Sequence, residues 1–296
     1  AFCLTASFSL GGNLFYHLTG NVHKTKKVWS RIFLASGITA FLVTFAGNLH
    51  TLYTFFKAYP NDNPVPLWQL PLQLASFPNS YWYPNATRFI YHTIHEFPMY
   101  SFVVSDLHGH VLDIPFVLLT LAVFLSILVR NNFSISYRLP IKKLHAISYK
   151  PYAIMTGFFL AVMYMTNAWD GLIYFMLAFF LICYYWLQKM YTHHLTKSYT
   201  AATIFIDTVV VGVSTLFFSL PFSLFFKPFA SGVGIVCPAD FLIKIGQIGP
   251  LVFEKDHCMR SPAWQLGILY GFFYFWVFSF LIFLIIRMKK KREQID

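Results

Sequence analysis

The stretch that decides the fold is "IHEFPMYSFVVSDLHGHVLDIPFVLL" (Ile94–Leu119), which changes from titratable to apolar residues within a few positions. Its titratable residues include Glu96, Asp106, His108, His110 and Asp113. The apolar part continues to Val129, which is about the length that a helix needs to cross a bilayer. Titratable groups are costly next to lipid, so we expect this polar end to be compensated or used for function.

The composition extends this interpretation to the whole chain of 296 residues, of which 57% are hydrophobic and 11% are charged. Soluble domains carry about 25% charged residues, so this chain cannot keep its surface in water. Seven runs are apolar enough for membrane helices, at 2–18, 28–47, 111–129, 152–168, 171–187, 203–220 and 264–286. The sequence predicts an all-α, polytopic helical protein of the cell membrane, with a single transmembrane domain over residues 1–296.

Basic residues are concentrated in every second connection between the predicted spans. They gather in the first, third and fifth connections and in the tail, for example at Lys26, Lys142, Lys189 and Lys290. The positive-inside rule places these segments in the cytoplasm, with the N-terminus outside and the C-terminus inside. This orientation agrees with an odd number of spans. It also explains the net charge of +11 without a nucleic-acid partner. Two longer loops, 48–110 and 221–262, then face outward.

Two of the four cysteines, Cys237 and Cys258, lie in the second outer loop. In an oxidising compartment they can form a disulfide. That bond would close a loop of about 20 residues and stabilise the fold by roughly 3 kcal/mol. The sequence does not decide whether Cys237 and Cys258 form this disulfide or are free thiols.

The residues before the third predicted span favour a helix start. Pro98 interrupts any helix that arrives from upstream, and Ser105 or Asp106 suits the N-cap of the helix that follows. From Asp106, helical spacing places His110 and Asp113 on one face.

Two kinds of chemistry suit this cluster. Carboxylates and imidazoles can hold a divalent metal ion, and although spacing alone does not decide the ligands, Asp106, His110 and Glu96 are the candidates. They can also transfer protons, with Asp106 and Glu96 as candidate catalytic groups. The free N–H groups of a helix start suit a phosphate, with His110 and His108 as partners, although His108 should lie on another face. Alternatively, Asp106 only caps the helix and the histidines are interfacial polar residues.

A second polar cluster, "TNAWDGLIY" (Thr166–Tyr174), falls at the predicted outer turn between the fourth and fifth spans. Its Asn167 and Asp170 are candidate substrate contacts. The alternative is a simple helix–turn–helix in which Asp170 caps the fifth span. Arg88 and Arg260 are outer cations that could bind a lipid phosphate.

Four groups of motifs resemble one family. They are Glu96-Phe97-Pro98 with Ser101-Phe102 and Asp106-Leu107-His108-Gly109-His110, then "AGNL" (46–49), "NAWD" (167–170), and "LPF" with "GVGIV" (220–222 and 232–236). On these motifs the chain resembles the YYY-domain family of bacterial and archaeal multi-pass membrane proteins. The family usually has a proline in place of Gly109, and its tyrosine-rich stretch should precede the first span. Because the chain starts at Ala1 inside an apolar run, we expect it to be the C-terminal part of the domain, without the N-terminal spans.

The family is grouped by resemblance with the integral-membrane C-type glycosyltransferases. This implies a polyprenyl-phosphate-linked sugar as donor, membrane lipid as partner, and Asp106 and Glu96 as base or metal ligands at the outer face. His108 and His110 would contact phosphate or metal, and Asn167 and Asp170 the acceptor. Whether the chain is an enzyme stays open, because two other functions fit these residues. One is a transporter or lipid-binding protein without catalysis, and the other is a metal-dependent lipid phosphatase or hydrolase.

Overall fold

The computed structural model describes most of the chain, in two compact units. The described residues are 2–18, 25–59, 63–77, 83–91, 93–105, 107–133, 144–226, 233–248, 251–254 and 260–293. Unit 1 comprises Ala1–Phe45 and Leu107–Lys227, and unit 2 comprises Ala46–Asp106 and Pro228–Asp296. Each unit therefore combines segments that lie far apart in the sequence.

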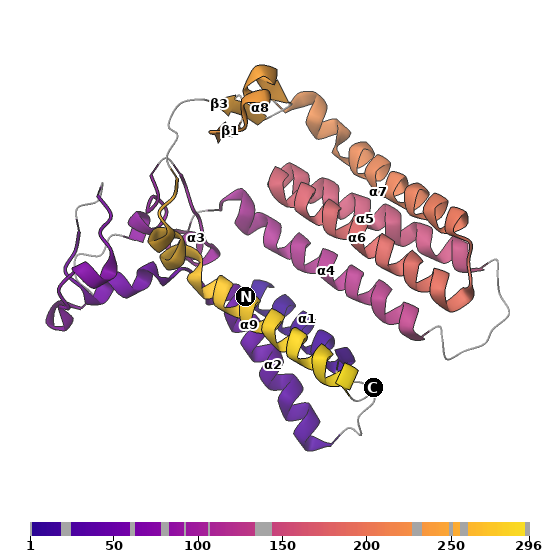
Figure 1. The fold of residues 1–296 in the computed structure, drawn as a ribbon, viewed down its shortest axis with the longest axis horizontal. Coiled ribbons are helices and arrows are strands. Elements are labelled where there is room, and N and C mark those ends of the chain that lie inside the picture. Colours follow the sequence, from indigo (N-terminus) through magenta and orange to yellow (C-terminus); the bar gives the residue numbers. More distant parts are fainter. Residues whose placement is uncertain are drawn as a thin grey trace. The chain divides into compact units, whose positions relative to one another are not determined.

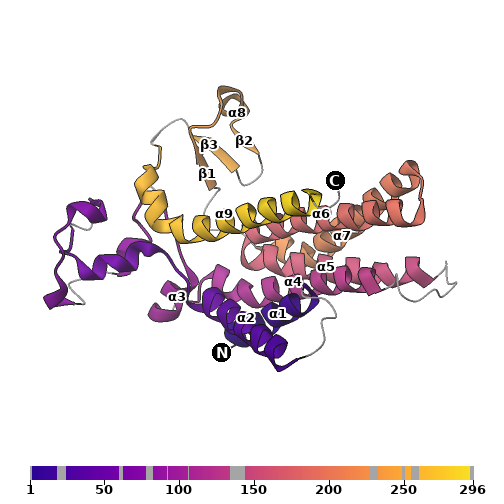
Figure 2. The ribbon, with the colours of Figure 1, turned by 60° about the horizontal axis from the view of Figure 1, so that its bottom comes forward.

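Unit 1 is a helical bundle. Its helices are α1 (Phe2–Leu18), α2 (Lys26–Phe45), α4 (Gly109–Phe133), α5 (Leu144–Thr166), α6 (Ala168–His193) and α7 (Lys197–Phe225). The helices α4 to α7 run side by side in both ribbon views (Figures 1 and 2), while α1 packs against α2 and α4. Apolar residues of the bundle interior include Leu160 and Met163 of α5, Ile182 of α6 and Val211 of α7.

Small residues let these helices approach closely. A Cβ atom added at Gly157 of α5 would lie 2.8 Å from the Val211 carbonyl oxygen of α7. Likewise, a Cβ at Gly12 of α1 would lie 2.4 Å from the Ser36 hydroxyl of α2. Apolar side chains gain little from leaving lipid for a protein interface, so membrane helices rely on such close packing.

All seven predicted spans coincide with helices of the described chain. Five helical segments are long and apolar enough to cross a membrane, namely Lys26–Phe45, Gly109–Val129, Ala168–His193, Lys197–Phe225 and Ala263–Lys289. The described apolar part of α5, Pro151–Thr166, is shorter, and α1 has 17 residues. The protein is thus a multi-pass helical membrane protein, while the count of seven and the orientation stay predictions.

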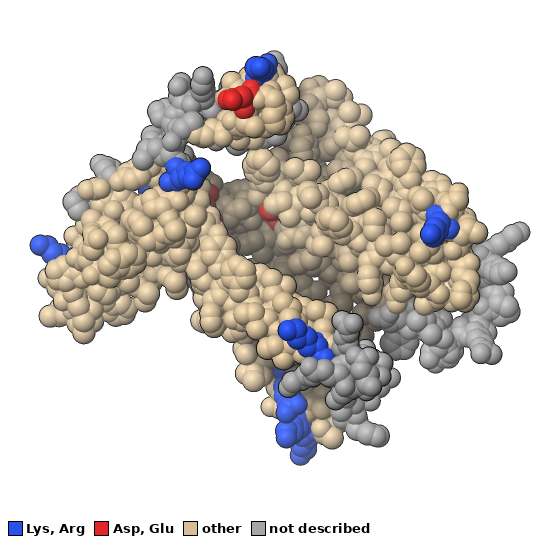
Figure 3. All heavy atoms as spheres, in the orientation of Figure 1, with Lys and Arg blue, Asp and Glu red and all other residues tan. Residues whose placement is uncertain are grey.

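The surface agrees with a lipid environment. Large apolar side chains such as Phe205, Leu216 and Phe217 of α7 are exposed. On the face shown in Figure 3, most of the surface is neither basic nor acidic. Exposed apolar area of this extent is rare on soluble monomers and is expected of helices that face hydrocarbon.

Unit 2 contains the first of the two long loops, which is rich in proline and has no long helix among its described residues. The segment forms the 3₁₀ helices η1 (Leu49–Phe55), η2 (Leu67–Gln69), η3 (Leu74–Ser76) and η4 (Tyr83–Ala86), followed by the short helix α3 (Pro98–Val104). Its aromatic core, which includes Tyr53, Tyr59 and Phe89, packs with Ile268 and Leu269 of α9 (Ala263–Glu293). The first turns of α9 therefore anchor the irregular segment.

The second long loop contains a small sheet, which corrects the expectation of an all-α chain. The strands β1 (Val233–Val236), β2 (Gln247–Ile248) and β3 (Leu251–Glu254) are arranged in the order β1-β3-β2. β1 is parallel to β3, and β2 is antiparallel to β3. The connection between β1 and β2 includes the short helix α8 (Asp240–Ile245). These strands are too short to give a clear alternating pattern, and their pairing depends on residues distant in sequence.

Cys237 follows β1 and is disulfide-bonded, while Cys3 and Cys183 are free. Cys258 lies outside the described residues. The pairing of Cys237 with Cys258 therefore stays a prediction.

His50 of η1 is completely buried in the aromatic core of unit 2. Its Nε2 atom lies 2.7 Å from the Tyr59 hydroxyl, and its ring stacks on Tyr53 with centroids 4.6 Å apart. Burial disfavours the charged imidazolium and lowers the pKa of His50 from 6.5 to about 3. His50 is thus a neutral packing residue in the folded protein.

This burial predicts an acid-sensitive fold. Below pH 6.5 the unfolded chain protonates this histidine and the folded chain does not, so stability is lost as the pH falls toward about 3. The loss should approach about 1.4 kcal/mol per pH unit for one group. In thermal unfolding of the purified protein, His50→Gln should flatten the dependence on pH, whereas His193→Gln, at an exposed position of α6, should not. Equal slopes for both variants would contradict the assignment.

Candidate functional site

The start of α4 lies three residues later than Asp106. Ser105, predicted as an N-cap, is instead the C-cap of α3 in the left-handed conformation, with φ 55°. The first amides of α4 donate to the His108 carbonyl, from Val111 at 3.0 Å and Leu112 at 3.1 Å. Because α4 begins at Gly109, the predicted spacing from Asp106 does not apply, whereas His110 and Asp113 lie one turn apart on the helix as predicted. Asp106 itself lies outside the described residues.

His108 and His110 lie next to each other at this helix start. Their ring centroids are 5.8 Å apart and the rings are tilted by 35°. The expectation that His108 occupies another face is wrong, because His108 precedes the helix and does not follow its spacing.

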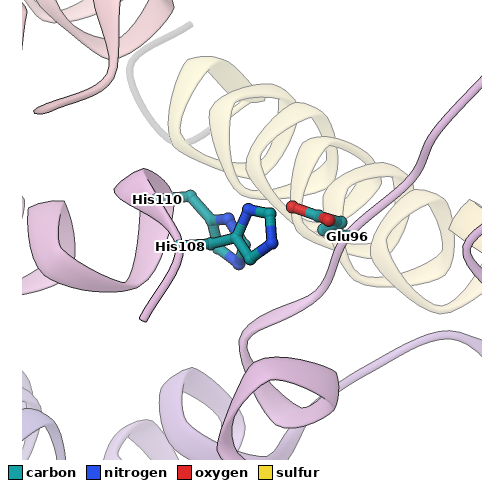
Figure 4. A group of neighbouring side chains, drawn as sticks. All are labelled: Glu96, His108 and His110. Atoms are coloured by element: carbon teal, nitrogen blue, oxygen red, sulfur yellow. The ribbon is translucent and has the colours of Figure 1, made fainter. Parts of the chain in front are cut away.

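Figure 4 labels these two histidines together with Glu96. The histidines come from the start of α4 in unit 1, and Glu96 comes from the extended segment before α3 in unit 2. Each of the three offers a donor atom that suits a metal ion.

One turn beyond His110, Asp113 is completely buried. Its Oδ1 atom accepts a hydrogen bond of 2.7 Å from the Thr166 hydroxyl at the end of α5. Its Oδ2 atom is buried without a hydrogen-bond donor among the described residues. The Asp113 carboxyl also lies within hydrogen-bonding range of the Asp170 carboxyl. Asp113 thus joins the second polar cluster, which the sequence left separate.

The second cluster forms the turn between α5 and α6. Asn167 has an extended backbone and takes the N-cap position of α6, while Asp170 lies in the first turn. The Asn167 side-chain amide donates to Asp170 Oδ2 at 2.8 Å. Asn167, rather than Asp170, therefore occupies the capping position. The positive end of the α6 dipole favours a negative charge at Asp170.

Gly109 brings the two clusters together. A Cβ atom built at Gly109 would lie 2.4 Å from the carbonyl oxygen of Thr166, closer than any side chain allows. The absence of a side chain lets the start of α4 contact the end of α5. Tyr174, one turn after Asp170, interacts electrostatically with both Asp113 and Asp170. One end of the bundle therefore collects imidazole, carboxyl, hydroxyl, amide and phenol groups.

The comparison with known families supports the membrane architecture. The chain matches the family described as "Uncharacterized membrane protein (DUF2298)" over residues 1–295. The chain belongs to this family. No curated protein and no solved structure matches the chain. Membership of DUF2298 agrees with the predicted resemblance to a multi-pass membrane family. The YYY-domain name and the position of the chain within that domain stay predictions.

Among the candidate site residues, the described structure brings together His108, His110, Asn167 and Asp170 within unit 1. Asp113, Thr166 and Tyr174 join this cluster, although the sequence did not assign any of them a binding or catalytic role. A signal was present for Asp113, which is an acidic residue inside an otherwise apolar run, one turn from His110. Arg88 and Arg260 are exposed in unit 2, and their binding of a lipid phosphate stays a prediction.

The close contact of α4 with α5 predicts that a methyl group added at Gly109 destabilises the protein, whereas one added at an open glycine does not. Gly109→Ala should lower the free energy of unfolding by about 1–3 kcal/mol, since the Thr166 carbonyl must move. Gly37→Ala, within α2, is the matched control because nothing lies within 4 Å of its built Cβ. That change should be neutral or stabilising by up to about 1 kcal/mol. Thermal unfolding in detergent measures both, and equal effects would contradict the contact.

Proposed function

We propose that this protein is an integral-membrane glycosyltransferase, which transfers a sugar from a polyprenyl-phosphate-linked donor at the outer membrane face. The observation that carries the proposal is that α4 bears two surfaces that such a donor needs. Its first residues hold polar and titratable groups, and its later turns line an apolar groove.

The groove lies between α1 and α4 and has a volume of about 790 Å³. On α4 it extends from Pro115 to Val129, which is about 21 Å at 1.5 Å per residue. Its α4 wall is mostly apolar, and the Asn13 amide on α1 donates to the Ser9 carbonyl at 2.9 Å. The amide nitrogen of that side chain is therefore bonded within its own helix. The groove therefore suits a hydrocarbon chain, whose head would then lie near the start of α4.

The polar end would bind the head of the donor. His108 and His110 would contact the phosphate, supported by the free N–H groups at the start of α4. Asn167 and Asp170 would contact the acceptor. By their place in the motif, Asp106 and Glu96 would act as the base or as metal ligands.

In the proposed reaction, an acceptor hydroxyl attacks the anomeric carbon of the donor sugar. The base takes the hydroxyl proton, the bond from the anomeric carbon to the phosphate oxygen breaks, and polyprenyl phosphate leaves with the bonding electrons. Positioned hydrogen-bond donors around the phosphate would stabilise the charge that develops on this leaving group. No oxidant or further reactant is needed.

The catalytic roles predict a large loss of product from single carboxylate changes. Asp106→Asn or Glu96→Gln should reduce transfer from a labelled polyprenyl-phosphate sugar by about 10²- to 10⁴-fold if the residue is the base. Asp240→Asn, at an exposed position of α8, should leave transfer unchanged. The assay uses native membranes that contain the protein and measures labelled glycolipid or glycan. Unchanged transfer in both variants, or release of free sugar alone, would refute the proposal.

The groove predicts that added bulk weakens use of the lipid donor. Ala122 lines the groove, so Ala122→Trp should lower kcat/KM for the donor about tenfold, equivalent to about 1.4 kcal/mol. Ala201→Trp, at an exposed position of α7, is the matched control. Equal activity of the two variants would show that the lipid chain does not occupy this groove.

A further inference from the structure

The buried carboxyl of Asp113 has an unusual environment. It is completely buried, and only one of its two oxygens accepts a hydrogen bond from a described residue. A buried polar atom without a partner costs about 1–3 kcal/mol, and a buried unpaired charge costs more. Another carboxyl in the bundle has a neutral hydrogen-bond donor beside it. Asp207 of α7 accepts a hydrogen bond of 2.6 Å from the Trp186 indole.

The neighbouring carboxyl of Asp170 adds a second negative group instead of a donor. Among the described residues, no Lys, Arg or His side chain forms an ion pair with Asp113 or Asp170. The C-terminal end of α5 lies at the same place, because Thr166 is its last residue, and it contributes a further negative partial charge. Two ionised carboxylates cannot donate to each other, so the pair needs either a shared proton or a bound cation in addition to the positive end of α6.

The hydrogen bonds orient both carboxyls in a complementary way. Thr166 engages Oδ1 of Asp113, which leaves Oδ2 without a donor. Asn167 engages Oδ2 of Asp170, which leaves Oδ1 without a donor among the described residues. Each carboxyl is thus held by one oxygen and offers the other. Neighbouring groups that fix ligand orientation in this way are typical of metal sites.

From this geometry we infer that Asp113 and Asp170 bind a divalent cation through oxygen ligands at the end of the α4–α6 bundle. Oxygen donors alone suit Mg²⁺, Mn²⁺ or Ca²⁺, rather than the softer ions that prefer thiolate. Water or a substrate oxygen would complete the coordination. The inferred site uses neither Glu96 nor His110, so it differs from the metal ligands predicted from the motif, and it does not depend on glycosyl transfer.

The test measures Mn²⁺ binding to the whole protein in nanodiscs after treatment with EDTA. Electron paramagnetic resonance of free Mn²⁺ should show saturable binding that Mg²⁺ or Ca²⁺ reverses. Asp113→Asn and Asp170→Asn should each abolish it. Thr166→Val keeps both carboxyls and removes only the orienting hydroxyl, so its affinity should fall about 10- to 100-fold. Asp240→Asn is the control with an exposed carboxyl and should bind like the wild type.

Thermal unfolding in EDTA identifies variants that fold, and the comparison is restricted to those. The wild-type protein is measured first. If it shows no saturable Mn²⁺ binding, the inference is overturned, and the two carboxyls share only a proton. Binding that survives Asp113→Asn but disappears in Glu96→Gln would also overturn it, by placing the cation on the other predicted ligands. Mn²⁺ binding without glycosyl transfer would support the cation site while refuting the proposed function.

Discussion

The hydrogen bond from the Thr166 hydroxyl to Asp113 is the contact on which the polar end of unit 1 depends. It connects α4 with the last residue of α5, directly before the break at Asn167 that starts α6. Gly109 permits the same approach on the backbone side. A buried polar group costs free energy unless it has a hydrogen-bond partner, and Thr166 supplies one for Asp113 Oδ1. The Thr166–Asp113 and Asn167–Asp170 hydrogen bonds thus hold both carboxyls where the three helix ends meet.

Histidines in the two units have different environments, which separates packing residues from candidate ligands. His50 is surrounded by Tyr53, Tyr59 and Phe89 and stays neutral because it is buried. His95 contacts the Tyr270 hydroxyl of α9, and burial lowers the pKa of its imidazole as well. The His95 contact links the irregular, Pro-rich segment to α9, whereas His50 packs within that segment. The imidazoles of His108 and His110 instead lie beside each other at a helix start.

The positions of the helices could be predicted from the sequence because apolar runs are local information. Each predicted span coincides with a helix, and the run that ends at Val129 became α4. The helix start was predicted less well, since Ser105 is a residue type typical of N-caps but is the C-cap of α3. Local chemistry identifies residues that can cap a helix. It does not decide which of two adjacent helices such a residue caps.

The partners of the site residues could not be predicted, because they depend on how distant segments pack. Asp113 and Thr166 are 53 residues apart, and no periodicity connects them. The β1–β3 pairing in unit 2 has the same origin, since Val233 and Leu251 meet only in the folded chain. Residue type could still predict that "NAWD" is a polar turn, because Asn and Asp at a helix start have a local physical role.

The depth of the acidic groups bears on whether the bundle transports ions or performs chemistry at one end. Asp113 lies four residues after the start of α4, and Asp170 lies two residues after the start of α6. Asp207 is deeper, ten residues after the start of α7, but the Trp186 indole occupies one of its oxygens. Transport sites in membrane bundles are usually near the midplane, at breaks within helices. Here the break falls at Asn167, between two helices, and the carboxyls lie within two turns of helix ends. An end-located site beside an apolar groove suits a substrate that keeps its chain in lipid and presents its head to water.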